Sequence, residues 1–406
     1  MIIIWGTKQE AIYTKNSILK SQNDLSSTLK YTDNQNYCQE KNLFVTDNKI
    51  LGFADNNSAL WDTILDGYNV FNPYEVLKNQ SVDTIIISIR NGDSIYSIID
   101  QIKEGMTHKI RIGILKLSSS DFHEIVDKNF LYEKILWLDT LKKPLFTYLQ
   151  CVLLTSCNLN CKGCTHFANL FNENKHQNYY DIDRLENDIN VIAEHSEVLR
   201  FRLLGGEPLL YPKLKQAVIV SRKSLPETDI RIVTNGLLIN RASPDLLKCF
   251  HDNRIGIDIS PYLPIMKSIN QIVDKLNEYD INYYFVGDKK QGITEFAKNI
   301  DFNHDTDPFE AMAHCISREC RTLYQGKIYK CPIDPLIMEF YQYFGMKANV
   351  CSSGFDVNAN NVGWREMITE LYKKPVNFCK YCSLQKSNFK WDQTIEPQKK
   401  DWLLEQ

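Results

Sequence analysis

The sequence predicts an α/β protein with two parallel sheets and a small cysteine-rich carboxy-terminal extension. Short apolar runs alternate with helical segments in residues 1–120 and again in residues 145–304, a pattern typical of doubly wound sheets and of (β/α) barrels. Nine of the twelve cysteines gather in three groups after residue 150. With 406 residues, 43% of them hydrophobic and 24% charged, the chain is long enough for two or three globular domains.

Residues 1–120 are expected to form a Rossmann-like domain. Four apolar runs predict its strands, and two segments between them predict helices. The strands are expected at Met1–Trp5, Ile50–Ala54, Thr84–Ile89 and Ile110–Leu115, and the helices at Gln9–Lys20 and Ser94–Lys103. Residues 121–144 are expected to connect this domain to the next, with a helical segment near Phe122–Asp127 and an apolar run at Ile135–Leu138.

This first domain resembles the Rossmann-like amino-terminal domains of sugar-modifying enzymes. The resemblance lies in the Ile-Ile-Ile run before Gly6 and in the segment Asn72–Val76. A dinucleotide-binding turn needs several glycines so that the backbone can approach the pyrophosphate. Only Gly6 is present, because Thr7–Ala11 follow it. A structural or substrate-presenting domain is therefore favoured, and a nucleotide or sugar-nucleotide site stays the alternative.

Residues 145–304 are expected to form a barrel or partial barrel of (βα) units. The expected strands are Leu149–Thr155, Val198–Leu204, Asp229–Thr234, Arg254–Ile259 and Asn282–Val286. The expected helices are about Ile182–His195, Lys213–Ser224, Asp245–His251 and Ile265–Tyr279. In such folds the active site lies at the carboxyl ends of the strands.

The loop after the first of these strands carries Cys157, Cys161 and Cys164 in the spacing Cys-x3-Cys-x2-Cys. A [4Fe–4S] cluster is normally held by four thiolates, so three thiolates leave one iron open to another ligand. Buried structural cysteines or zinc ligands are the alternative. Three cysteines at this spacing directly after a strand favour the cluster.

This loop resembles the signature of the radical S-adenosylmethionine (SAM) superfamily. The resemblance implies that the open iron binds the amine and carboxylate of SAM. It also implies that an electron from the cluster cleaves SAM to a 5′-deoxyadenosyl radical, which removes a substrate hydrogen. In the family the residue before the third cysteine is usually apolar or aromatic and helps to seat the adenine. Here it is Gly163, so Phe167 or another ring is expected to supply that surface.

The same resemblance implies SAM-binding residues at three further strand ends. The segment Gly205-Gly206-Glu207-Pro208 matches the family element that binds the amino group of SAM, with the carboxylate of Glu207 as the expected acceptor and the glycines allowing close approach. Asn235 and Ser260 are expected to contact the SAM carboxylate and ribose, and Asp258 is a weaker candidate. Each of these polar residues could equally be a helix cap or a turn residue.

Residues 305–406 carry the remaining cysteine groups. A hairpin around Gln325–Gly326 is expected to bring Cys320 and Cys331 together, and Cys379-x2-Cys382 can complete a four-thiolate site. A structural zinc ion would suit such a site as well.

The spacings Cys315-x10-Gly326-x4-Cys331 and Cys379-x2-Cys382 resemble the SPASM and twitch extensions of radical SAM enzymes, which hold auxiliary [4Fe–4S] clusters. The resemblance implies one auxiliary cluster, for which five cysteines compete, so that Cys315 or Cys320 is redundant. Cys351 is expected to be no ligand.

The resemblance as a whole implies a radical SAM oxidoreductase that dehydrogenates or epimerises a sugar or sugar-nucleotide-type substrate. A radical SAM peptide-modifying enzyme is the alternative, and a non-catalytic iron–sulfur or zinc protein is a further one. A reducing partner such as flavodoxin or ferredoxin is expected if the chain is either of these two enzymes.

Charge and hydropathy exclude other classes of function. The net charge is −3, with 47 Lys and Arg against 50 Asp and Glu, so nucleic acid is not an expected partner. No apolar run reaches the length of a membrane span, and the opening MIIIWG is too short for a signal peptide. A cytoplasmic protein with reduced cysteines is therefore expected.

Overall fold

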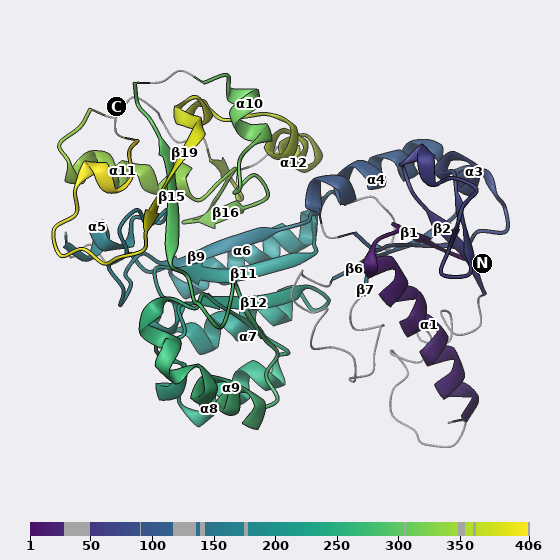
Figure 1. Cartoon of the computed structure of the whole chain (residues 1–406), viewed down its shortest axis with the longest axis horizontal. Helices are drawn as coiled ribbons and strands as arrows, with labels where there is room; N and C mark the ends of the chain where they lie inside the picture. Colours follow the sequence, from purple (N-terminus) through teal and green to yellow (C-terminus); the bar gives the residue numbers. More distant parts are fainter. Residues whose placement is uncertain are drawn as a thin grey trace. The chain divides into compact units, whose positions relative to one another are not determined.

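The computed structural model describes residues 1–27, 49–89, 91–116, 135–138, 143–173, 178–303, 306–347, 354–359 and 363–404. The chain divides into two compact units, Met1–Lys143 and Pro144–Gln406 (Figure 1). Each unit has its own sheet, so each is described by itself. Within the described ranges, no helix is long and apolar enough to cross a membrane.

The first unit is built on a seven-stranded sheet with the order β3-β4-β2-β1-β5-β6-β7. Its central strands run parallel, while β3 and β7 pair antiparallel at the two edges. The strands are β1 (Ile2–Trp5), β2 (Ile50–Ala54), β3 (Ile64–Leu65), β4 (Tyr68–Phe71), β5 (Thr84–Ile87), β6 (Arg111–Leu115) and β7 (Ile135–Leu138). The helices are α1 (Gln9–Ser27), α3 (Pro73–Lys78), α4 (Gly92–Gly105) and the 3-10 helix η1 (Ser58–Leu60). The predicted doubly wound parallel sheet is thus confirmed.

The segment expected to connect two domains contributes a strand to this first sheet. In β7, Leu136 pairs with Ile114 of β6. Gly113 of β6 leaves room for β7, because a Cβ at that position would lie 2.6 Å from the side chain of Ile135. The run at residues 135–138 therefore covers a sheet edge, which corrects the expectation that it belongs to the connection. The helical segment expected near Phe122–Asp127 lies outside the described residues.

The carboxyl edge of the first sheet is occupied by contacts within the chain itself. Gly6 has φ +128° and packs against β5, where an added Cβ would lie 2.9 Å from the carbonyl oxygen of Ser88. The hydroxyl of Thr7 donates to Asp55 Oδ2 at 2.7 Å, and the backbone N–H of Asn57 donates to Asp55 Oδ1 at 2.9 Å. The single glycine of this turn thus serves packing between strands.

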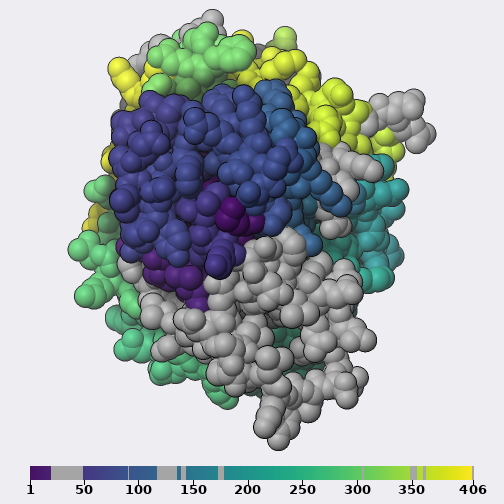
Figure 2. Space-filling model, turned by 90° about the vertical axis from the view of Figure 1, so that its right-hand side faces the viewer, coloured from purple at the N-terminus to yellow at the C-terminus, as the bar shows by residue number. Residues whose placement is uncertain are grey.

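The start of the chain, dark purple in Figure 2, lies at the surface, and its ammonium group bonds Asp83 at 2.7 Å.

The second unit contains the predicted partial barrel. Five parallel strands lie side by side in the order in which the chain forms them, β9-β11-β12-β13-β14. They are β9 (Leu149–Leu154), β11 (Arg200–Gly205), β12 (Asp229–Thr234), β13 (Gly256–Ile259) and β14 (Tyr283–Phe285). The helices between them, α6 (Ile182–His195), α7 (Leu214–Ser224), α8 (Pro244–Asp252) and α9 (Ile269–Glu278), lie along the sheet in Figure 1. Every strand and helix predicted for residues 145–286 is therefore present.

Shorter elements complete this part of the second unit. The short strands β8 (Leu145–Phe146) and β10 (Glu197–Val198) pair with each other, and α5 (Ala168–Glu173) follows the cysteine loop. The 3-10 helices are η3 (Pro208–Leu210), η4 (Ile239–Arg241) and η5 (Leu263–Ser268).

The carboxy-terminal residues extend the same sheet. β16 (Arg321–Tyr324) pairs parallel with β9, and the hairpin to β17 (Lys327–Tyr329) and then β18 (Phe355–Asp356) follow antiparallel. Gln325 and Gly326 both have positive φ, +47° and +78°, as a tight two-residue hairpin requires, so the predicted turn is confirmed. The extension is therefore continuous with the partial barrel.

The rest of the extension packs on an aromatic core. It comprises α10 (Pro308–Ala313), α11 (Ile333–Tyr343), α12 (Trp364–Lys373), the 3-10 helices η6 (Asn377–Tyr381) and η7 (Lys399–Asp401), and the antiparallel pair β15 (Glu295–Ile300) and β19 (Cys382–Lys390). Phe167, Phe340 and Trp402 lie at the centre of this core, with ring centroids 5.7 to 5.9 Å apart. The core joins the segment after the cysteine loop to the end of the chain.

Candidate functional site

The three cysteines of the first group meet in one loop at the carboxyl end of β9. Burial raises the pKa of all three thiols, that of Cys161 to about 12, and charges on the neighbouring cysteines raise the pKa of Cys157 and Cys161 further. The sulfur atoms therefore lie within electrostatic range of one another. Their surroundings are apolar and aromatic, formed by Leu159, Leu237, Tyr262, Phe296 and Trp391. Burial therefore favours the neutral thiols as long as no metal is bound, and a bound cluster would stabilise their thiolate forms.

Hydrogen-bond donors surround the sulfur atoms. The backbone N–H of Leu159 donates to Cys157 Sγ at 3.4 Å, and the indole N–H of Trp391 donates to Cys161 Sγ at 3.3 Å. The amide group of Asn235 lies 3.7 Å from Cys157 Sγ. Donors of this kind stabilise negatively charged thiolates, so the environment supports the prediction that these cysteines are cluster ligands.

Gly205, the last residue of β11, and Gly206 after it allow the backbone to pass close to the start of the cysteine loop. A Cβ on Gly205 would lie 2.2 Å from the carbonyl oxygen of Leu154, and one on Gly206 would lie 2.0 Å from that of Ser156. Two backbone hydrogen bonds close this contact, Gly206 N–H to Leu154 O and Glu207 N–H to Ser156 O, both 2.9 Å. The glycines were expected to let a ligand approach. In the structure they let β11 bind the cysteine loop.

Glu207 is buried next to Asn235 and bonds to its backbone. Its side chain is 0% exposed, and its carboxylate accepts bonds from Leu209 N–H at 3.0 Å, the Thr234 hydroxyl at 2.7 Å and Asn235 N–H at 2.9 Å. Burial raises its pKa to about 7, and these donors counteract the rise. Pro208 follows as the buried first residue of η3. The carboxylate has no exposed surface in this structure, and its contact with the amino group of SAM stays a prediction.

Asn235 is the predicted cofactor residue that does reach the cysteines. Its amide donates to Asn158 Oδ1 at 2.7 Å, and its side-chain oxygen accepts from Leu237 N–H at 3.0 Å. The backbone N–H of Asn235 donates to the carboxylate of Glu207. A buried carboxylate, the amide of Asn235 and the first cysteine are thus connected in one hydrogen-bonded chain.

Tyr262 is an aromatic residue beside the cysteines, whereas Phe167 is 0% exposed within the aromatic core. Of the two expectations for the adenine surface, Phe167 or another ring, the structure thus favours another ring. Tyr262 stacks on Trp391 with ring centroids 5.5 Å apart, and burial together with the charges of the three cysteines raises its pKa above the usual range. Ser260 contributes to its placement, since its carbonyl oxygen accepts from Tyr262 N–H at 2.8 Å. Sequence reasoning missed Tyr262 and Trp391, because neither has a recognisable spacing from the cysteine loop.

Four of the carboxy-terminal cysteines approach one another around Cys315. Burial raises the pKa values of Cys331, Cys379 and Cys382, that of Cys382 to about 12, and the charge of Cys315 raises each further. Within the described ranges, however, no three histidine, cysteine or carboxylate side chains converge on a point where a single metal ion could bind.

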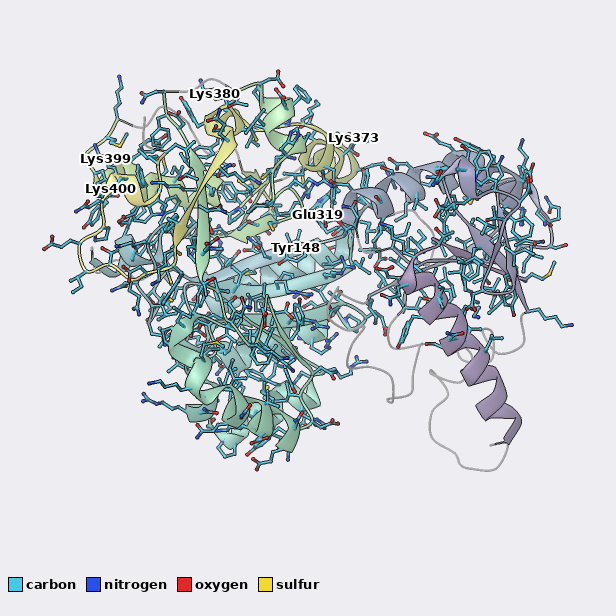
Figure 3. All side chains as sticks on the ribbon, in the orientation of Figure 1. Tyr148, Glu319, Lys373, Lys380, Lys399 and Lys400 are labelled. Atoms are coloured by element: carbon cyan, nitrogen blue, oxygen red, sulfur yellow. The ribbon has the colours of Figure 1, made fainter. Side chains whose placement is uncertain are left out.

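Cys320 also lies near Cys315 but faces other groups. Burial raises its pKa to about 12, Cys315 and Glu319 add to the rise, and Arg321 opposes it. Tyr148, labelled with Glu319 in Figure 3, has its pKa raised by burial and next by the charge of Cys320. Cys320 therefore points towards β9 and the start of β16. Cys351, expected to be no ligand, lies outside the described residues.

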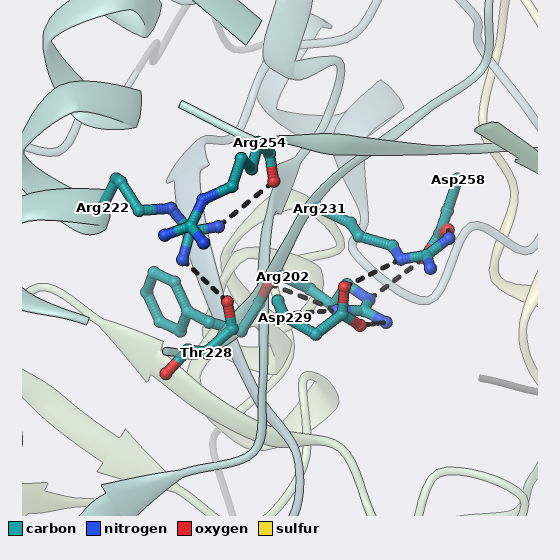
Figure 4. A network of polar contacts seen from close by, with 8 residues as sticks. Arg202, Arg222, Thr228, Asp229, Arg231, Arg254 and Asp258 are labelled. Atoms are coloured by element: carbon teal, nitrogen blue, oxygen red, sulfur yellow. Dashed lines mark hydrogen bonds and ion pairs between the residues drawn. The ribbon is translucent and has the colours of Figure 1, made fainter. Parts of the chain in front are cut away.

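Charged residues of β11, β12 and β13 form ion pairs with one another (Figure 4). Arg202 lies 3.0 Å from Asp229 Oδ2 and 3.0 Å from Asp258 Oδ2. Arg231 lies 3.1 Å from Asp229 Oδ1 and 3.2 Å from Asp258 Oδ1. Burial alone would raise the pKa of Asp229, but Arg231 and Arg202 hold it well below its usual range. Asp258, a weaker candidate for SAM binding, is thus part of a closed ring of ion pairs.

Similar proteins in the curated collection are GTP 3′,8-cyclases. That of Trichodesmium erythraeum (strain IMS101) is 34% identical over 108 residues, which cover 25% of this chain and 31% of the relative. That of Alkaliphilus metalliredigens (strain QYMF) is 28% identical over 130 residues, which cover 31% of this chain and 38% of the relative. The chain thus spans about a third of the length of these relatives.

Solved structures with a similar chain path include BtrN in complex with AdoMet and 2-DOIA, at 15% identity and TM-score 0.35, covering 64% of this chain and 100% of that chain. SuiB of Streptococcus suis bound to the precursor peptide SuiA has 14% identity and TM-score 0.30, covering 59% and 71%. At these values neither likeness carries an argument about activity.

The family comparison addresses the site directly. The model of the radical SAM superfamily matches residues 152–283, which include the cysteine loop, the Gly-Gly-Glu-Pro segment, the whole of β11, β12 and β13, the second half of β9 and the first residue of β14. Residues 152–283 thus match the radical SAM superfamily, which confirms the resemblance predicted from the sequence.

Proposed function

We propose that the chain is a radical SAM oxidoreductase that removes a hydrogen atom from a sugar or sugar-nucleotide-type substrate. A [4Fe–4S] cluster and SAM are the cofactors of this superfamily, and when bound they supply the one-electron chemistry that generates the 5′-deoxyadenosyl radical. The observation that carries the proposal is the meeting of Cys157, Cys161 and Cys164 in one loop at the carboxyl edge of the sheet.

The residues around this loop have separate tasks in the proposed mechanism. The three thiolates hold the cluster, and Asn235 offers an amide beside Cys157. Tyr262 offers an aromatic face next to all three cysteines. Glu207 is a positioning residue, because its carboxylate fixes the backbone of Asn235 and the loop after β11. The aromatic core beneath the loop excludes water from one side.

We further propose an auxiliary [4Fe–4S] cluster held by Cys315, Cys331, Cys379 and Cys382. The charge of Cys315 raises the pKa values of Cys331, Cys379 and Cys382, which supports the set. Cys315 also raises the pKa of Cys320, so Cys320 stays the competing fifth cysteine. A single zinc ion held by the same four thiolates is the alternative.

The Rossmann-like first unit supports a sugar or nucleotide-linked sugar as the substrate, by fold analogy alone.

Incubation of the reconstituted, reduced protein with SAM and candidate substrates tests this proposal. The measurement follows 5′-deoxyadenosine and the substrate mass by mass spectrometry, with a panel of nucleotide-linked sugars and a panel of short peptides. We expect a nucleotide-linked sugar to accelerate 5′-deoxyadenosine formation and to lose two hydrogens or, on epimerisation, to take up deuterium from heavy water. Acceleration by peptides alone would establish the peptide-modifying alternative and overturn the sugar assignment.

A further inference from the structure

The last described segment of the chain contacts the cysteine loop. This C-terminal strap, defined as residues 391–402, follows β19 directly. Its backbone forms one antiparallel bridge with the loop, between Cys161 and Gln393, through the bonds Lys162 N–H to Asp392 O at 2.9 Å and Thr394 N–H to Asn160 O at 2.8 Å. The indole N–H of Trp402 donates to the carbonyl oxygen of Cys164 at 2.9 Å.

Gly163 is the residue that makes this contact possible. It has φ +65°, and an added Cβ would lie 2.7 Å from the ring of Phe389 and 2.8 Å from the carbonyl oxygen of Asp401. A larger residue before the third cysteine would therefore push the strap away. This accounts for the glycine at a position where the superfamily usually has an apolar or aromatic side chain, and it links the loop sequence to the strap.

Trp391 is held rigidly within this contact. It is 6% exposed, it stacks on Tyr262 with an interplanar angle of 25°, and its backbone N–H donates to Thr294 O at 2.8 Å. Its indole N–H donates to Cys161 Sγ at 3.3 Å. Because this donor is already held in place, little conformational entropy is lost when it bonds to a more negatively charged sulfur.

We propose that Trp391 sets the reduction potential of the SAM-binding cluster through its hydrogen bond to Cys161. The inference rests on the proposed function, since it needs a cluster on Cys157, Cys161 and Cys164. Adding an electron makes the thiolates more negative, and a hydrogen bond to a cluster sulfur stabilises the more negative state. Trp391 therefore favours the reduced state from which SAM cleavage starts. It is a positioning residue of the electron-transfer step and touches no substrate atom.

Trp391→Phe tests the inference, with Trp402→Phe as the matched control. Each variant keeps an aromatic ring in place and removes one indole N–H, but the partner of the first is a sulfur atom and that of the second is a backbone oxygen. The midpoint potential is measured on the holoenzyme by redox titration of the electron paramagnetic resonance signal that SAM perturbs. Loss of one charge-assisted hydrogen bond is expected to shift the redox equilibrium about tenfold, which is about 59 mV for a one-electron couple. We expect the midpoint potential of Trp391→Phe to be about 59 mV lower than that of the wild type, and the midpoint potential of Trp402→Phe to be unchanged.

A second measurement needs no variant and covers the case in which Trp391→Phe folds poorly. In the wild-type holoenzyme labelled with indole-¹⁵N tryptophan, electron–nuclear double resonance of the same signal is expected to show coupling to one ¹⁵N nucleus. Equal potentials in the wild type and Trp391→Phe, or no ¹⁵N coupling, would overturn the inference while leaving the proposed function intact. A reconstituted wild-type protein without any SAM-sensitive signal would overturn both.

Discussion

Gly206→Ala separates the packing role of the glycine pair from a ligand-binding role. A Cβ at residue 206 would lie 2.0 Å from the carbonyl oxygen of Ser156 and 2.3 Å from its carbonyl carbon. Ordinary contacts of a Cβ begin at 3.4 Å, so β11 and the start of the cysteine loop would have to separate by about 1.4 Å, the difference between these distances. The obstructing atoms are backbone, so no side-chain rotation can relieve the clash.

The cost follows from the bonds that such a movement breaks. Gly206 N–H to Leu154 O and Glu207 N–H to Ser156 O, both 2.9 Å, would be lost. Two backbone hydrogen bonds contribute about 0.5–1.5 kcal/mol each, and overpacking costs about 1–3 kcal/mol. The free energy of unfolding is therefore expected to fall by about 2–6 kcal/mol, a large part of the total of an ordinary domain. Because Cys157 follows Ser156, the variant is also expected to bind less iron.

Urea unfolding and iron content after reconstitution measure both effects. Gly345→Ala is the control, because it lies in the same unit and no atom lies within 4 Å of its added Cβ. Its φ of +59° costs about 1–2 kcal/mol, and its iron content should equal that of the wild type. If Gly206→Ala unfolds at the wild-type urea concentration, keeps its iron and loses only SAM affinity, the packing account is refuted in favour of ligand approach.

Three further predictions follow from the site and its surroundings. Reconstituted wild-type protein is expected to hold about eight irons, and the triple variant of Cys157, Cys161 and Cys164 to alanine about four, by colorimetric assay; full iron in the variant would contradict the ligand assignment. Asp229→Asn leaves Arg202 and Arg231 short of a buried counter-charge, so urea unfolding should show a loss of about 3–5 kcal/mol, and an unchanged midpoint would contradict the ion-pair ring. Because the folded pKa of Asp229 lies below its unfolded value of 3.8, its stabilisation is complete above that pH and is lost as the pH falls, so the difference between wild type and Asp229→Asn should shrink below about pH 4. A polypeptide of residues 1–143 is expected to bind NAD weakly or not at all in calorimetry, since Thr7 already bonds Asp55; micromolar affinity would contradict this.

Local sequence patterns were sufficient to predict most of the fold. The strands of both parallel sheets stand out because they are short apolar runs bounded by polar or glycine residues, and the helices between them have capping residues such as Asp181 and Ser243. β7 was not predicted as part of the first sheet, because pairing of an edge strand depends on a distant partner. The register of Leu136 against Ile114 leaves no trace in either segment alone.

The cysteine loop could be recognised for a similar reason, since three thiols on one short loop are close in sequence and in space. The burial of each site residue was not predictable from the sequence. The same four letters, Gly-Gly-Glu-Pro, suit an exposed carboxylate and a buried one, and only the structure shows that Glu207 is covered. Trp391 was missed because about 230 residues separate it from Cys161, so its role arises from tertiary packing.

Formation of 5′-deoxyadenosine tests the central claim most directly. Reconstituted, dithionite-reduced protein is incubated with SAM without substrate, beside the variant in which Cys157, Cys161 and Cys164 are alanine. The account predicts slow release of 5′-deoxyadenosine by the wild type and none by the variant, although the variant keeps the iron of the carboxy-terminal site. Equal release by both proteins, or no release by a wild type with its full complement of iron, would contradict the assignment of the three cysteines as the site of SAM cleavage.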